Sequence, residues 1–133
     1  MHETFKRLHD KLNEAMTYGF YIEAIAIEYA IIDNRITRIT DLLQISVQSY
    51  GFKKRFKEVK KTIKSSKFME DYTITTDVSH RITNFINDRN SLIHGLVEMD
   101  LDETFVEYVA KEGIFVVNYL QNLSQYIKKR LNL

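Results

Sequence analysis

The absence of proline constrains the fold of this chain more than any other feature. Proline breaks a helix because it lacks a backbone donor and its ring clashes with the preceding turn. The 133 residues also include only four glycines, so long helices meet few interruptions. Apolar residues recur every three or four positions over most of the chain, as in helices with one buried face. The sequence therefore predicts an all-α bundle, and its length predicts a single domain over residues 1–133.

The apolar spacing predicts four main helices and one short basic helix. The expected helices cover about 3–17, 21–46, 52–63 and 77–96 and a final stretch after residue 102, with a polar, flexible loop over 65–75. Thr76 or Asp77 is expected to cap the fourth helix. Asp100 or Asp102 is expected to cap the last, which Gly113 interrupts and could kink.

Composition excludes several classes of protein and of site. The chain has no cysteine, so it forms neither disulfides nor thiolate metal sites. No apolar run approaches the roughly 20 residues of a membrane span, and the polar start of the chain is unlike a secretory signal. We therefore expect a cytoplasmic protein that is not bound to a membrane. No histidine or carboxylate spacing typical of a metal site is present, nor a glycine-rich phosphate loop, so we expect no metal and no cofactor.

Charge is distributed unevenly, although the net charge is only +1. Residues 53–67 include eight basic side chains and one acid, Glu58, whereas acids cluster over 98–107. A lopsided distribution of this kind can form a surface that faces phosphates. A solvated surface helix would give the same pattern, and the sequence supports both interpretations equally. The six residues predicted to contact RNA are Lys53, Lys54, Arg55, Lys57, Lys60 and Lys61.

The motif that carries chemistry begins at Arg89-Asn90 and ends at His94-Gly95. Arginine binds phosphate in a planar, bidentate manner and keeps its charge. Histidine is the side chain best suited to moving protons near neutral pH. A cation and a proton carrier within two helical turns suit the cleavage of a phosphodiester.

Arg89 occupies an apolar position of the helical pattern, where a guanidinium needs a partner. Glu28 is similarly placed within an apolar segment of the second helix. We therefore expect Glu28 to contact Arg89 and to fix its orientation. Composition and spacing alone favour a structural interpretation, with Arg89 in a buried ion pair and His94 near a helix C-terminus, where its charge is favourable.

With three residues between Asn90 and His94, the motif resembles the signature of the HEPN superfamily (higher eukaryotes and prokaryotes nucleotide-binding domains). The chain length, the helical pattern and the late position of the motif agree with this resemblance. It implies an HEPN-like helical bundle and a metal-independent endoribonuclease of toxin–antitoxin or phage-defence type. Two protomers would form a homodimer with RNA in a shared cleft.

The resemblance also implies roles for individual residues. His94 would act as general base or acid, Arg89 would stabilise the pentavalent phosphate, and Asn90 would orient the histidine or a phosphate oxygen. An antitoxin protein would be a further partner. Leu96 stands where one branch, which pairs with a nucleotidyltransferase antitoxin, has a tyrosine, so regulation through that tyrosine is not expected. The alternatives are a non-catalytic nucleotide- or protein-binding module and a small helical regulator of another protein.

Overall fold

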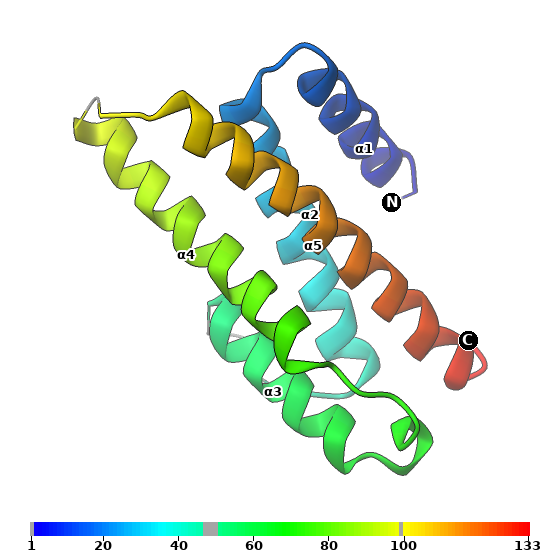
Figure 1. The fold of residues 1–133 in the computed structure, drawn as a ribbon. Helices are drawn as coiled ribbons and strands as arrows, with labels where there is room; N and C mark the ends of the chain where they lie inside the picture. Colours follow the sequence, from blue (N-terminus) through cyan, green and yellow to red (C-terminus); the bar gives the residue numbers. More distant parts are fainter. Residues whose placement is uncertain (1, 47–50, 99) are drawn as a thin grey trace.

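The fold is entirely helical over the residues that the computed structural model describes, 2–46, 51–98 and 100–133. These residues form five α-helices and one turn of 3₁₀-helix, with no strand among them, which confirms the all-α prediction. The elements are α1 (His2–Thr17), α2 (Tyr21–Leu42), α3 (Phe52–Ser65), η1 (Lys67–Met69), α4 (Thr76–Glu98) and α5 (Glu103–Arg130) (Figure 1). No helix in the described ranges is long and apolar enough to cross a bilayer.

The bundle is organised around the pair α2 and α5, which pack along most of their lengths. On this central pair, α1 packs against α2 and α4 packs against α5, so that α1 and α4 lie on opposite sides (Figure 1). The short helix α3 lies beside the second half of α2. Isoleucines of α2, including Ile31 and Ile36, meet Leu120 and Ile127 of α5 in a fully buried core. Removal of this apolar surface from water is the main force that holds the helices together.

Helix α2 ends four residues earlier than the sequence predicted. Its C-cap is Leu43, and Gln44 adopts a left-handed backbone with φ of 58°. The amide of Ile45 then donates to the carbonyl of Thr40 at 2.9 Å, which satisfies a carbonyl that the ending helix leaves without a partner. The apolar pattern continues past this point, so it did not reveal the stop.

The segment 65–75, which its polarity predicted to be a flexible loop, contains the end of α3 and the 3₁₀ turn η1 and is irregular elsewhere. Its first residue still belongs to α3, and η1 places Met69 completely out of solvent. The hydroxyl groups of Tyr72 and Tyr119 lie 2.9 Å apart in hydrogen-bond contact. One buried methionine and one tyrosine pair therefore fasten the segment to α5.

Two hydrogen-bond patterns identify the residues that cap the starts of α4 and α5. At the start of α4, the hydroxyl of Thr75 accepts from the amide of Val78 at 3.2 Å. The cap is thus Thr75 rather than Thr76 or Asp77, because the helix begins one residue earlier than expected. At the start of α5, the carboxylate of Asp102 accepts from the amide of Thr104 at 2.9 Å, and Asp102 rather than Asp100 is the cap.

Candidate functional site around Arg89

Arg89 projects from α4 toward α2 and stacks on an aromatic ring. Its Cζ atom lies 3.8 Å from the centroid of the Tyr29 ring, and its Nη1 donates to Oδ1 of Asn90 at 3.1 Å. Phe85 and Leu92, which flank it on the same stripe of α4, are buried. The cation–π contact explains how a charged group is accommodated at the edge of the core. Among the described residues, no carboxylate forms an ion pair with Arg89.

The predicted contact between Glu28 and Arg89 is wrong. Glu28 is fully buried, as its sequence context indicated, but it faces α5 and its carboxyl lies where a side chain on Gly113 would be. Neither carboxyl oxygen has a hydrogen-bond partner in the described part of the chain. Burial raises the pKa of Glu28 to about 9, so the group is uncharged at neutral pH and needs no cation.

The geometry of a helix explains why the expectation failed. Successive residues of a helix point about 100° apart, so Glu28 and Tyr29 of α2 face different neighbours. Tyr29 meets the guanidinium from α4, and Glu28 meets the Gly113 backbone of α5. The sequence identified the correct stretch of α2 as the neighbour of Arg89 but the wrong residue within it.

His94 is exposed near the C-terminal end of α4, on the same face as Asn90. No described residue forms a hydrogen bond with its ring. Arg89 and His94 lie five residues apart, which in a regular helix separates them by about 140° and about 7.5 Å along the axis. Asn90 joins the two, because it shares the face of His94 and bonds to Arg89.

A groove between α2, α3 and α4 brings the motif next to the basic helix. It encloses about 320 Å³. Its lining residues are Tyr29, Gly51, Phe52, Lys53, Lys54, Ile86 and Asn90. The groove thus places Lys53 and Lys54, two of the predicted RNA contacts, beside Asn90. It also places them beside the ring of Tyr29, on which Arg89 stacks.

The other predicted RNA contacts divide into two groups. Arg55 forms an ion pair with Asp33 of α2, and Lys60 donates to the hydroxyl of Ser79 at 2.8 Å. These two side chains fasten α3 to its neighbours. By contrast, Lys57 and Lys61 are exposed to solvent, so the basic surface of α3 is narrower than the run of charges in the sequence.

Two residues near the motif were missed by sequence reasoning. Tyr29 looked like one more core aromatic at helical spacing, and only the position of α4 gives it the role of supporting Arg89. Asp88 precedes Arg89 and is half-buried. Burial raises the pKa of Asp88, and the charge of Glu112 on α5 raises it further.

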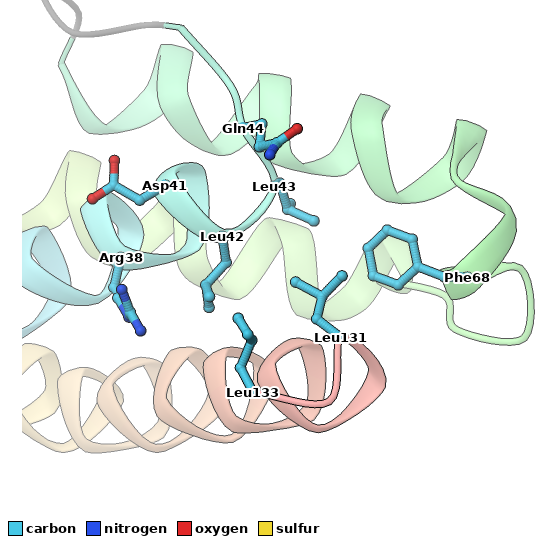
Figure 2. Close-up of a pocket in the computed structure, with 8 residues that line it drawn as sticks. All are labelled: Arg38, Asp41, Leu42, Leu43, Gln44, Phe68, Leu131 and Leu133. Carbon is cyan, nitrogen blue, oxygen red and sulfur yellow. The ribbon is translucent and has the colours of Figure 1, made fainter.

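A larger cavity lies away from the motif, between the end of α2, η1 and the C-terminus (Figure 2). It encloses about 520 Å³ and none of the predicted site residues lines it. Five of its eight lining residues are apolar: Leu42, Leu43, Phe68, Leu131 and Leu133. Within the described ranges, no group of three histidine or acidic side chains is arranged to hold a metal ion.

No protein-family model, curated protein or solved structure matches this chain. The fold alone does not specify an activity, because small helical bundles carry many functions. Function must be inferred from the residues of the site and from the resemblance of the motif.

Proposed function

We propose that this chain is a metal-independent endoribonuclease of toxin–antitoxin or phage-defence type, as the resemblance to the HEPN superfamily implies. The observation that supports this most directly is the environment of Arg89. Tyr29 and Asn90 hold its guanidinium in place, and no described carboxylate neutralises it. A positioned cation beside a groove with two lysines suits the stabilisation of charge on a phosphate.

In the proposed reaction, His94 removes the proton from a ribose 2′-hydroxyl, and the oxygen attacks the adjacent phosphorus. The bond from phosphorus to the 5′-oxygen breaks, and a protonated histidine returns a proton to that oxygen. The products are a 2′,3′-cyclic phosphate and a 5′-hydroxyl. Arg89 pairs with the non-bridging oxygens as negative charge develops on them, while Asn90 keeps the guanidinium oriented.

A second protomer would complete this site. The separation of Arg89 and His94 around α4 makes it difficult for one chain to direct both at the same phosphate. Beside His94, the last turns of α4 expose Ile93, Leu96 and Val97, and Val97 is 80% accessible to solvent. Leu96 follows Leu92 by four residues on α4, yet Leu92 is buried whereas Leu96 is 43% accessible. Pairing of this apolar end about a two-fold axis would bring the motifs of two chains together.

The exposed lysines of α3 would guide the RNA to the cleft. Lys53 and Lys54 line the groove that contains Asn90, and Lys57 and Lys61 extend the charge along the helix. Contacts of this kind bind the phosphate backbone without reading its sequence. They weaken as the salt concentration rises, because the release of counterions from the RNA on binding is then less favourable.

The decisive experiment is cleavage of a mixed set of RNAs by the purified protein in EDTA. We expect cyclic-phosphate ends from the wild type and a loss of at least about 100-fold in rate for His94→Ala, the usual contribution of a general acid or base. Arg89→Ala should show a comparable loss. His80→Ala is the matched control, because His80 is an exposed histidine on the same helix, and its rate should equal that of the wild type.

Undiminished cleavage by His94→Ala would contradict the mechanism. The absence of cleavage by a folded, dimeric wild type would favour the second candidate, a non-catalytic module that binds nucleotides or RNA. One observation supports that candidate: no described residue forms a hydrogen bond that would orient the His94 ring. Such a module should still bind RNA, and Arg89→Ala should weaken the binding whereas His94→Ala should not.

A further inference from the structure

One end of the bundle carries most of the large apolar side chains that are exposed in the described ranges. Apart from the three at the end of α4, which belong to the proposed dimer contact, five lie near the α1–α2 turn or at the start of α5: Tyr18, Phe20, Ile22, Leu101 and Tyr108. Figure 1 shows the α1–α2 turn and the start of α5 at the same end of the molecule. Tyr18 and Phe20 are 66% and 57% accessible, and their rings stack with centroids 6.0 Å apart. Exposed apolar side chains that gather at one end of a molecule indicate a binding site.

The α1–α2 turn and the start of α5 enclose a groove of about 420 Å³. One wall comes from the start of α2 and the other from the start of α5. The lining residues are Gly19, Tyr21, Ile22, Leu101, Glu103, Val106 and Glu107. Among these described residues, the only charged ones are thus Glu103 and Glu107, and both come from α5.

The charge around the groove has one dominant sign. Residues 95–110 include five acids and no lysine or arginine. In the described part of the chain, Glu103 has no ion-pair partner, whereas Glu107 pairs with Lys111 at 2.6 Å. Asp102 is occupied as the cap of α5. The net charge that faces an approaching partner is negative.

We propose that this groove docks a basic amphipathic helix from another protein. Two apolar side chains one turn apart would enter the groove, and flanking lysines or arginines would face Glu103 and its acidic neighbours. The groove shares no described lining residue with the groove at Asn90 and includes none of the exposed apolar residues of α4, and the proposal does not depend on ribonuclease activity.

A second copy of this chain fits the groove poorly. A symmetric contact would place the same acidic surfaces against each other. The basic helix α3 cannot supply the anchors, because its apolar side chains Phe52, Phe56 and Val59 are already buried. The basic C-terminal residue Arg130 is engaged with Asp71 of its own chain.

The test uses two synthetic, fluorescently labelled helical peptides and the full chain. Both peptides carry leucine and phenylalanine one turn apart, and their flanking positions are lysine in one and glutamate in the other. Fluorescence anisotropy should show binding of the lysine peptide alone, with affinity that falls as salt increases. Ile22→Ser and Glu103→Lys, both of which change residues that line the groove, should each weaken binding by about tenfold, as expected for an apolar contact and for a facing charge.

Matched controls are Leu133→Ser, which removes an exposed apolar side chain at the opposite end, and Glu70→Lys, which reverses an exposed acid elsewhere. Both should bind the lysine peptide as the wild type does, and circular dichroism should show that all variants fold. Equal binding of the two peptides, or equal binding by Ile22→Ser and the wild type, would overturn the proposal. So would self-association of the free chain that Ile22→Ser abolishes, because a second copy would then cover the groove.

Discussion

At position 28 a carboxyl group occupies the contact between two helices that an apolar side chain would normally fill. Glu28 is fully buried and its oxygens have no described partner. An ionised carboxylate without a partner is far more costly to bury than a neutral one. The protein therefore folds with Glu28 protonated, and burial raises its pKa from 4.5 to about 9.

This shift predicts that stability depends on pH. Between pH 4.5 and 9 the folded chain keeps the Glu28 proton and the unfolded chain releases it. The free energy of unfolding should fall as pH rises through this range, by up to about 1.4 kcal/mol per pH unit. Glu28→Gln cannot titrate, so its slope should be shallower by about this amount. Urea unfolding of both proteins at several values from pH 5 to 8 measures the difference, and identical slopes would contradict the buried, protonated state.

The residue scale also separates what sequence can and cannot predict about the site. The spacing of apolar residues identified Arg89 as a cation at the edge of the core and Glu28 as a buried acid. It could not identify their partners, because a partner is chosen by the rotation of one helix against another. The ring of Tyr29 determines the environment of Arg89, and the missing side chain at Gly113 determines that of Glu28. The spacing of apolar residues in the helix that carries Arg89 or Glu28 contains no information about either partner.

At the scale of single elements, α5 shows how a glycine can serve packing rather than bending. The sequence suggested a kink at Gly113, yet α5 runs as one helix from Glu103 to Arg130. The glycine is buried on the inner face, where it leaves room for the Glu28 carboxyl. Val116 and Leu120, which follow Gly113 by three and seven residues, are also buried, whereas Phe115 and Tyr119 are half-buried.

A pair of substitutions tests this packing. Gly113→Ala should favour the helix by about 1 kcal/mol through its propensity, but the new methyl group overlaps Glu28, and overpacking costs about 1–3 kcal/mol. We therefore expect Gly113→Ala to destabilise the wild type. In a Glu28→Ala background the obstacle is gone, so the same change should become neutral or stabilising. Thermal unfolding of the four proteins gives the sign in each background, and the same sign in both would show that Glu28 is not the obstacle.

At the scale of the whole molecule, the exposed end of α4 bears on assembly. Ile93, Leu96 and Val97 are 42%, 43% and 80% accessible, whereas Ile82 and Phe85 at the other end of α4 are buried. Apolar surface at only one end of a helix suggests that a second molecule covers it. The proposed cleft requires that molecule to be another copy of this chain.

We predict that Val97→Asp converts a dimer into a monomer, because it places a charge in the proposed interface. Leu133→Asp is the control, since it adds the same charge at an exposed leucine elsewhere. Sedimentation equilibrium measures both, and RNA cleavage should decline with the dimer. A wild type that is monomeric at high concentration would remove the shared cleft from the mechanism.

The sequence by itself determined the helical class of this protein, the approximate span of its helices and the position of its unusual residues. These features depend on local physics: the lack of proline, the period of apolar residues and the few polar groups that interrupt it. The tertiary structure alone decided that Arg89 rests on Tyr29, that Glu28 meets Gly113 and that segment 65–75 is fastened to α5. It also brought Lys53 and Lys54 beside Asn90 and left the end of α4 uncovered. Such contacts join residues far apart in the chain, and they depend on how the helices are rotated and aligned when the core closes.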